Sequence, residues 1–259
     1  MPEGDTIHHL ARTLRPLLEG RRIDGAVRGY GPWRRGETES LVGHVVESVE
    51  ARGKNLLVHL DGGLVFWSHL GIDGYWRRVG AERRAPEEET LRLTVGGEQF
   101  ALFKAAEASV LRENNLARVL GDLGPDLLAE GFDPSLAARR ALARPGAIAD
   151  VLLDQGVASG IGNVYKSESL YIQRIHPWDT LTDEAALAAL YELNARLLRQ
   201  NLGRPQRITT SGAARRMGPV WVYDRTGRAC LTCGEPVRSR RQGQDARMTY
   251  WCPRCQPPR

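Results

Sequence analysis

The sequence of 259 residues is long enough for one large domain or two smaller ones, and its 42% hydrophobic and 26% charged content is that of a soluble globular protein. No apolar run reaches the roughly 18 residues of a membrane-spanning helix, and the acidic residues 1–5 lack the apolar core of a signal peptide. We therefore expect a cytoplasmic protein that does not contact a membrane.

Positive charge is concentrated toward the C-terminus. The net charge is +5, but residues 199–259 hold 13 arginines against three acidic residues, and the preceding 198 residues carry a net −5. A basic block of this size is typical of a nucleic-acid surface, with a solvated face as the alternative. Only three of the 36 basic residues are lysines, Lys54, Lys104 and Lys166. A GC-rich genome accounts for this bias, yet a retained lysine favours a role that arginine cannot fill.

The N-terminal part of the chain predicts one helix followed by β-structure. Apolar side chains over residues 7–18 recur at helical spacing, with Asp5 as the expected N-cap and Gly20 as the expected end. Short apolar alternations follow at residues 43–50, 55–60, 64–67 and 91–95, and residues 61–63 predict a hairpin turn. Residues up to about 115 therefore predict a helix with a β-sandwich or barrel.

After the predicted β-structure, the sequence becomes typical of helices. Residues 121–126 are rich in turn formers and indicate a linker, and residues 131–202 are rich in Ala, Leu and Arg. A helix is predicted over 145–155, a glycine-rich double turn over 159–163, and a second helix over 164–173. The second helix would present Asn163 and free backbone N–H groups at its start, where phosphate binds well. Many helix–helix turns share this glycine pattern.

The four cysteines form two C-x-x-C pairs near the C-terminus. Cys230 and Cys233 are separated from Cys252 and Cys255 by 18 residues, which matches a tetrahedral zinc site. Disulfides or a redox pair are the alternatives, and disulfides fit a cytosolic chain poorly. Four thiolates fill the coordination sphere, so we expect one structural zinc ion and no catalytic metal.

A hairpin is predicted between the two cysteine pairs, with strands at 236–238 and 248–251. Arg240, Arg241 and Arg247 are expected at or beside its tip, where they suit a nucleic-acid groove. A ribbon that only caps the fold is the alternative.

In this order, the motifs resemble the formamidopyrimidine-DNA glycosylase / endonuclease VIII family. They are Pro2-Glu3-Gly4, Arg52-Gly53-Lys54, the segment SHLGIDG at 68–74, the segment GIGNVYKSE at 160–168 and Tyr250-Trp251-Cys252-Pro253. The resemblance covers essentially the whole chain. It implies an α+β fold with a β-sandwich and N-terminal helix (1–115), a linker (116–130), a helix-two-turn-helix domain (131–215) and a zinc finger (216–259), with DNA bound between the lobes.

The resemblance also implies a bifunctional DNA glycosylase/AP lyase. Removal of Met1 would leave Pro2 with a free secondary amine that attacks C1′ of the damaged nucleotide. The ordinary α-amino pKa of about 7.7–8.0 leaves enough neutral amine at pH 7 for this role. Glu3 would act as general acid and base, although a lone acid at a helix start commonly serves only the helix dipole. Lys54 would contact the phosphate of the lesion.

The remaining site residues follow from the same resemblance. Ile72 would fill the gap left by the flipped base, and Asn163 and Arg247 would bind neighbouring phosphates. His69 either positions phosphate or is a core histidine. Glu168 either faces the site or serves its helix. Lys104 and Lys166 match no motif and are expected at the surface or in backbone contacts.

The sequence departs from the pattern of many members at two places, and the second departure bears on the substrate. Asp5-Thr6 replace the Pro-Glu of many members, so the second acid is missing. The Asp-Pro-Arg-Arg-Phe-Gly segment of formamidopyrimidine-type members is absent, since residues 103–110 read FKAAEASV. We therefore expect excision of oxidised pyrimidines followed by β,δ-elimination, with 8-oxoguanine excision or non-catalytic DNA binding as alternatives.

The partner we expect is damaged double-stranded DNA, with single-stranded or bubble DNA left open. Residues 209–220 would form a flexible loop near the damage pocket. The protein is expected to act as a monomer at the bacterial nucleoid.

Overall fold

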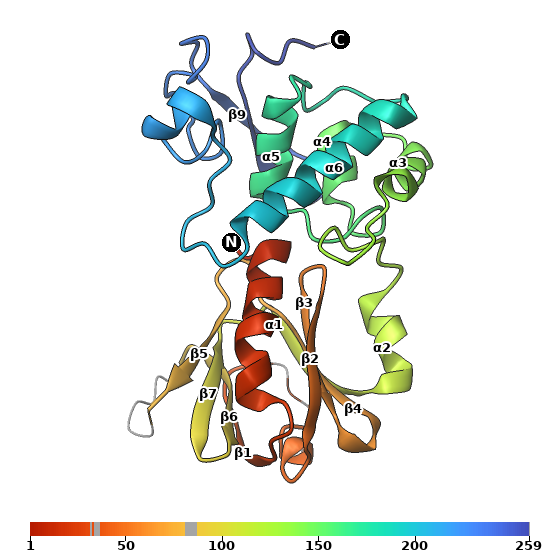
Figure 1. Cartoon of the computed structure of the whole chain (residues 1–259), viewed down its shortest axis with the longest axis vertical. Helices are drawn as coiled ribbons and strands as arrows, with labels where there is room; N and C mark the ends of the chain where they lie inside the picture. The colour runs from red at the N-terminus through yellow and green to blue at the C-terminus, as the bar shows by residue number, and fades with distance from the viewer. Residues whose placement is uncertain (32, 34–36, 81–86, 259) are drawn as a thin grey trace. The chain divides into compact units, whose positions relative to one another are not determined.

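The structure is a computed structural model that describes residues 1–31, 33, 37–80 and 87–258 (Figure 1). The chain divides into two compact units, Met1–Asp122 and Leu123–Arg259. The first unit contains α1 (Gly4–Leu18), β1 (Ile23–Arg28), β2 (Val46–Arg52), β3 (Asn55–Leu60), β4 (Leu64–His69), β5 (Tyr75–Val79), β6 (Glu89–Val95), β7 (Glu98–Phe103), β8 (Glu107–Arg112) and α2 (Glu113–Leu120), with short 3-10 turns at Glu39–Leu41 and Asp61–Gly63.

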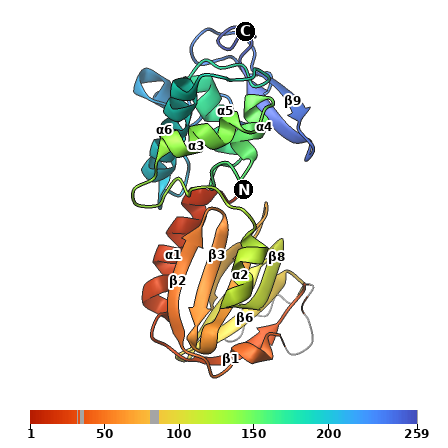
Figure 2. The ribbon, with the colours of Figure 1, turned by 90° about the vertical axis from the view of Figure 1, so that its right-hand side faces the viewer.

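The first unit is a sandwich of two antiparallel four-stranded sheets. Their strand orders are β1-β6-β7-β5 and β2-β3-β4-β8. Because side chains alternate along a strand, Leu56 and Val58 of β3 are buried in the core between the sheets and α1, whereas Leu57 faces the other way. There Leu57 packs with Leu116 of α2, which covers the outer face of the second sheet (Figure 2). The predicted β-sandwich with an N-terminal helix is confirmed.

The N-cap of helix α1 lies two residues earlier than expected. The N-cap is Glu3 rather than Asp5, and Asp5 lies buried in the first turn. The Thr6 hydroxyl accepts a hydrogen bond from the Glu3 backbone N–H at 3.4 Å, and Asp5 Oδ1 accepts one from the Thr6 N–H at 2.8 Å. Asp5 and Thr6 therefore accept hydrogen bonds from backbone N–H groups at the start of the helix. These are the positions at which the sequence departs from the family pattern.

The second unit contains the helices and the cysteine-bearing ribbon. Its elements are α3 (Pro134–Leu142), α4 (Ile148–Leu153), α5 (Asn163–Ile172), α6 (Glu184–Asn201), a 3-10 turn at Gly212–Arg216, β9 (Arg238–Gln242) and β10 (Arg247–Trp251). Asp133 and Asp183 cap α3 and α6 by accepting hydrogen bonds from the backbone N–H two residues on. Helix α5 lies at the centre of the unit, since all its residues from 163 to 171 are buried.

Helix α4 is shorter than the predicted helix over 145–155. Asp154 and Gln155 leave the helix because their side chains bond to the loop that follows: Asp154 Oδ1 accepts from Gly156 N, and Gln155 Oε1 accepts from Gly160 N. The Gln155 amide also donates to Leu153 O and Ile161 O. These local bonds compete with the helix ladder and shape the double turn that leads into α5.

The segment 116–130, expected as a linker, is divided between the two units. Its first part belongs to α2, which packs on the second sheet, and the unit boundary lies between Asp122 and Leu123. Leu127 is buried in the helical core, and Asp126 forms an isolated bridge to Ser159. The helical part and the cysteine-bearing ribbon share one compact unit. In the described part of the chain, no helix combines the length and the apolar character needed to cross a bilayer.

Candidate functional site

The start of α1 places one buried carboxyl group beside the second residue of the chain. Glu3 is fully buried, Pro2 is half-buried and Met1 is 36% exposed. A carboxyl group with little access to water is suited to general acid and base work. The chain thus presents residue 2 next to a group that can exchange protons with a reactant.

Lys54 lies in a two-residue turn at the same end of the first unit. Arg52 of β2 pairs with Asn55 of β3, so Gly53 and Lys54 alone connect the strands. Gly53 has a φ of +58°, as the first position of such a turn requires. Figures 1 and 2 both show the start of α1 and the β2–β3 turn at one end of the sheet. Lys54 itself is half-buried.

The predicted wedge loop emerges beside this turn. Asn55 pairs with His69, so the segment after β4 leaves the sheet at the same end as Lys54. His69 Nδ1 accepts a hydrogen bond from Gly71 N at 3.2 Å, so this half-buried histidine shapes the loop. Gly71 has a φ of +66°, and a Cβ there would lie 2.6 Å from the Ala106 Cβ. Ile72, the next residue of this loop, is 57% exposed.

The first unit therefore brings four of the predicted residues to one end of one sheet. They are Glu3 with its neighbour Pro2, Lys54 in the β2–β3 turn and Ile72 in the β4–β5 loop. An exposed aliphatic side chain on a tight loop can insert between stacked bases, and a lysine can meet a phosphate.

In the second unit, Asn163 is the first residue of α5 and contacts the hairpin. Its Nδ2 donates to the backbone oxygen of Met248 at 2.8 Å, and the residue is 7% exposed. Among the described residues, Asn163 Oδ1 has no hydrogen-bond partner. The amide expected to meet a phosphate is thus held in place by β10.

Glu168 has a structural role that the sequence left open. Its fully buried carboxylate accepts hydrogen bonds from the Thr209 hydroxyl and from the backbone N–H groups of Trp221, Val222 and Tyr223. Burial raises the pKa of Glu168, while these donors favour the ionised form. Glu168 therefore anchors both ends of the segment 209–223, which includes the loop 209–220 that was expected to be flexible.

The first strand of the hairpin begins and ends later than predicted, so two arginines that were expected at or beside the tip lie within the strand. Strand β9 starts at Arg238 because Pro236 has no N–H to donate and forms only an isolated bridge to Ala229. Arg240 and Arg241 thus lie within β9, and residues 243–246 form the tip. Arg247 opens β10 with its side chain 41% exposed, and its Nε lies 3.8 Å from Asp245 Oδ2.

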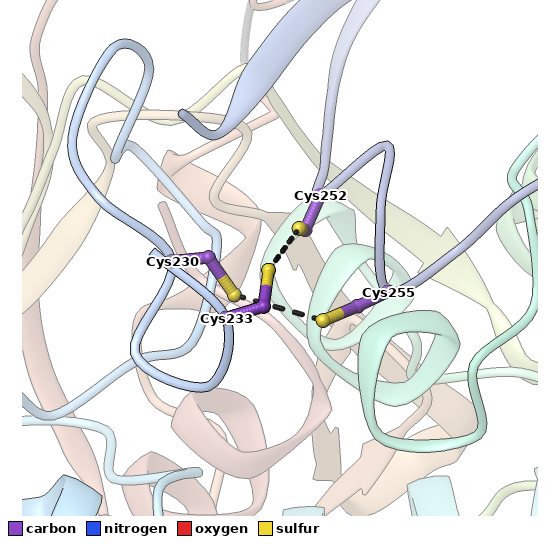
Figure 3. Close-up of side chains that lie close together, drawn as sticks. All are labelled: Cys230, Cys233, Cys252 and Cys255. Atoms are coloured by element: carbon purple, nitrogen blue, oxygen red, sulfur yellow. Dashed lines mark hydrogen bonds between the residues drawn. The ribbon is translucent and has the colours of Figure 1, made fainter. Parts of the chain in front are cut away.

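The four cysteine side chains converge on one point, as Figure 3 shows. All four sulfurs lie within 4.8 Å of one another. The separations are 3.8 Å for Cys230–Cys255 and 3.5 Å for Cys233–Cys252, far from the about 2.05 Å of a disulfide. A tetrahedron of sulfurs each about 2.3 Å from zinc has edges of about 3.8 Å. The residues therefore fit a four-thiolate metal site.

The roles of two residues beside these sites were not predicted from the sequence. Lys166, expected at the surface or in backbone contacts, is 1% exposed, and its Nζ donates to a side chain, Thr249 Oγ1, at 2.7 Å. Tyr171 places its hydroxyl 3.1 Å from Cys230 Sγ. The scarcity of lysine singled out Lys166 but gave no sign of its burial. Lys104 does lie at the surface, paired with Glu88 at 2.8 Å.

Comparisons with known proteins agree with both units. Residues 1–106 match the formamidopyrimidine-DNA glycosylase N-terminal domain, and residues 123–210 match the formamidopyrimidine-DNA glycosylase H2TH domain. The chain is 39% identical to a "Probable endonuclease 8 2" of Streptomyces coelicolor, over 99% of this chain and 94% of the relative. It is 36% identical to the "DNA-(apurinic or apyrimidinic site) lyase Nei2" of Mycolicibacterium smegmatis, over 99% of both.

Solved structures share the fold. Lactococcus lactis formamidopyrimidine-DNA glycosylase, bound non-covalently to DNA with an AP site, superposes with a TM-score of 0.82 at 20% identity. The match covers 99% of this chain and 100% of that one. MutM in complex with DNA containing carbocyclic 8-oxo-G gives a TM-score of 0.83 at 22% identity, with the same coverage.

Proposed function

The chain belongs to the formamidopyrimidine-DNA glycosylase family, and from this membership we infer that it is a DNA glycosylase with AP lyase activity in base excision repair. The observation that carries the inference is the buried Glu3 beside Pro2 at the end of the sheet that also bears Lys54. A protein that only bound DNA would have no need of this grouping.

The reaction we propose begins at Pro2, once Met1 has been removed. The secondary amine forms a bond to C1′ as the glycosidic bond breaks, and the base leaves with the bonding electrons and takes up a proton. Glu3 donates a proton to the sugar ring oxygen, so the ring opens and an iminium remains. Successive β- and δ-elimination then cleave the strand on both sides of the sugar.

The other site residues bind the DNA in this proposal. Lys54 contacts the phosphate of the lesion, helped by His69, which orders the neighbouring loop. Ile72 fills the gap left by the flipped nucleotide. Asn163 and Arg247 contact adjacent phosphates, which positions the strand without reading its sequence.

Oxidised pyrimidines are the substrates we propose. Relatives at 39% and 35% identity are named probable endonuclease 8 2 and endonuclease 8 2, and the connection after β7 lacks the Arg-Phe pair of formamidopyrimidine-type members. Excision of 8-oxoguanine is the second candidate, because relatives named formamidopyrimidine-DNA glycosylase are 30–32% identical to this chain. We expect the substrate to be double-stranded DNA, and excision from single-stranded and bubble DNA is to be compared with excision from the duplex.

The four cysteines hold one structural zinc ion in this proposal, since their spacing matches four zinc–thiolate bonds. The residues that hold it are Cys230, Cys233, Cys252 and Cys255. The zinc stabilises the ribbon that carries Arg247 and takes no part in the chemistry. The protein acts as a monomer on DNA in the bacterial cytoplasm, at the nucleoid.

Borohydride reduction in the presence of abasic-site DNA tests this chemistry, because it converts the iminium into a stable covalent adduct. We expect an adduct of one protein with one strand, nearly lost in Pro2→Gly. Intact mass of the same preparation reports removal of Met1. A correctly processed protein that gives no adduct contradicts the lyase assignment and favours the non-catalytic alternative.

Excision from thymine-glycol, 5-hydroxyuracil and 8-oxoguanine substrates, each as duplex, bubble and single strand, decides the lesion. Equal or faster excision of 8-oxoguanine opposite cytosine would overturn the preference for pyrimidines.

A further inference from the structure

One face of α5 is bonded to two successive residues of β10. Asn163 Nδ2 donates to Met248 O at 2.8 Å, and Lys166 Nζ donates to Thr249 Oγ1 at 2.7 Å. Asn163 and Lys166 are three residues apart and so lie on the same side of the helix. The start of α5 and the strand that begins with Arg247 are therefore held in register by side chains.

The Lys166 contact is buried on both sides. Lys166 is 1% exposed and Thr249 is fully buried. Removing an ammonium group from water is unfavourable unless hydrogen bonds compensate, so an apolar side chain of similar length would fill this space more favourably. A lysine at this place makes a directional hydrogen bond, which fixes one residue of β10 relative to α5.

Arg247 lies between two anchored residues. Thr249, two residues further along β10, points to the same face of the hairpin as Arg247. Gln242 pairs directly with Arg247 across the hairpin, and its Nε2 donates to Pro177 O at 3.2 Å. The Arg247 side chain nevertheless stays 41% exposed and lines an open groove of about 600 Å³ beside the start of α4. Its backbone is fixed while its guanidinium remains accessible.

We propose that Lys166 is a positioning residue for Arg247. Through Thr249 it sets where β10 begins relative to α5, so that Arg247 and Asn163 meet neighbouring phosphates of one strand together. The inference rests on the proposed function, in which Arg247 binds a DNA phosphate. Lys166 itself need not touch DNA.

The test compares variants that break this contact from either side. Lys166→Met keeps the chain length without the ammonium, and Thr249→Val keeps the shape without the hydroxyl. Lys104→Met, at an exposed lysine, is the matched control. The measurement is affinity for a duplex with a tetrahydrofuran abasic analogue across a range of salt concentrations, with zinc content checked by native mass.

We expect Lys166→Met, Thr249→Val and Arg247→Ala each to bind on the order of tenfold more weakly and to lower the salt slope by about 1. In the Arg247→Ala background, Lys166→Met should have little further effect, because both act through one contact. Thr249→Ser should restore binding, and Lys104→Met should bind as the wild type does. A role limited to stability would lower melting temperature without changing the slope.

Three results would overturn the inference. In the first, Lys166→Met weakens DNA binding equally in the wild-type and Arg247→Ala backgrounds. In the second, Thr249→Val binds DNA as tightly as the wild type. In the third, Arg247→Ala leaves DNA affinity unchanged. If Lys166→Met fails to fold, the comparison of Thr249→Val with Thr249→Ser decides whether the contact positions Arg247. Borohydride trapping of the wild type tests the proposed lyase chemistry separately. A wild type that gives no adduct would contradict the proposed function, whereas the binding measurements test the role of Lys166.

Discussion

The Tyr171 hydroxyl lies 3.1 Å from the sulfur of Cys230 and 2.7 Å from Thr232 Oγ1. Tyr171 belongs to the last turn of α5, the helix whose first residue, Asn163, bonds to β10. The cysteine cluster and the hairpin strand are thus connected through one buried helix as well as through the ribbon itself.

This contact predicts that Tyr171→Phe weakens metal retention without unfolding the protein. Groups that hydrogen-bond to metal ligands typically contribute 10–100-fold to affinity, so we expect zinc loss to a chelator to become at least about tenfold easier. The phenyl ring would keep the stacking on Trp221, whose ring centroid lies 5.3 Å away. Chelator competition followed by absorbance measures the effect.

Tyr191→Phe provides the matched control. Tyr191 is a buried tyrosine whose hydroxyl has no hydrogen-bond partner among the described residues. Its variant should retain zinc as the wild type does. Equal retention by Tyr171→Phe would show that the hydroxyl does not support the metal site.

Removal of the proposed zinc ion should weaken DNA binding before any chemistry takes place. The ribbon that carries Arg247 is held at one end by the cysteines, and four-cysteine sites contribute folding free energy directly. We expect chelated protein to bind abasic duplex at least about tenfold more weakly, and added zinc to restore binding. Fluorescence anisotropy with a labelled duplex measures this, and undiminished affinity of metal-free protein would contradict it.

Ile72 should matter for duplex substrates and much less for single strands. Burial of an aliphatic side chain in the base stack contributes about 1.5–3 kcal/mol, so Ile72→Ser should slow excision from duplex DNA on the order of tenfold or more. Ile72→Leu should restore most of the rate, and Val27→Ser, at another exposed aliphatic residue, should leave it unchanged. An equal loss on single-stranded substrate would argue against a wedge.

His59 should make stability depend on pH. It lies between Glu50 Oε1 at 3.1 Å and Glu113 Oε2 at 3.0 Å, and hydrogen bonding to Glu50 raises the pKa of His59 above its usual range despite partial burial. A raised pKa in the folded state stabilises the fold below the usual histidine pKa of about 6.5, and this contribution is lost as pH rises through the folded value.

The variant His59→Gln isolates this contribution. The melting temperature of the wild type should exceed that of the variant most clearly near pH 6, where Glu50 is ionised because hydrogen bonding to His59 lowers its pKa. The difference should narrow toward pH 9. Arg52 also pairs with Glu50, at 2.9 Å, and remains in place in both proteins. A pH-independent difference would show that packing of His59 alone is responsible.

Features set by local spacing could be predicted from the sequence. Two C-x-x-C pairs are enough to predict that four sulfurs converge, because each pair is a tight turn and the hairpin returns the chain. The sandwich followed from apolar alternation, since Leu56 and Leu57 point to opposite faces of the same sheet.

Features that depend on contacts far along the chain could not be predicted. Lys166 is buried because β10, some 80 residues later, covers it, and Glu168 is held by segments 41–55 residues away. Strand β9 was expected at 236–238 but spans Arg238–Gln242, because Pro236 forms only an isolated bridge and the arginine-rich residues that follow do not resemble a strand. The cap of α1 was misplaced because Asp5 is the commoner capping residue, whereas Glu3 occupies that position here.

The burial of α5 has a consequence for how the second unit opens. Its amide hydrogens should exchange with solvent only when the surrounding layers separate, and the hairpin, the segment 209–223 and the first cysteine turn are each bonded to its side chains. A single opening event would therefore release all of them together. The unit should behave as one foldon, with little room for a half-formed state that retains the ribbon but has lost the helix.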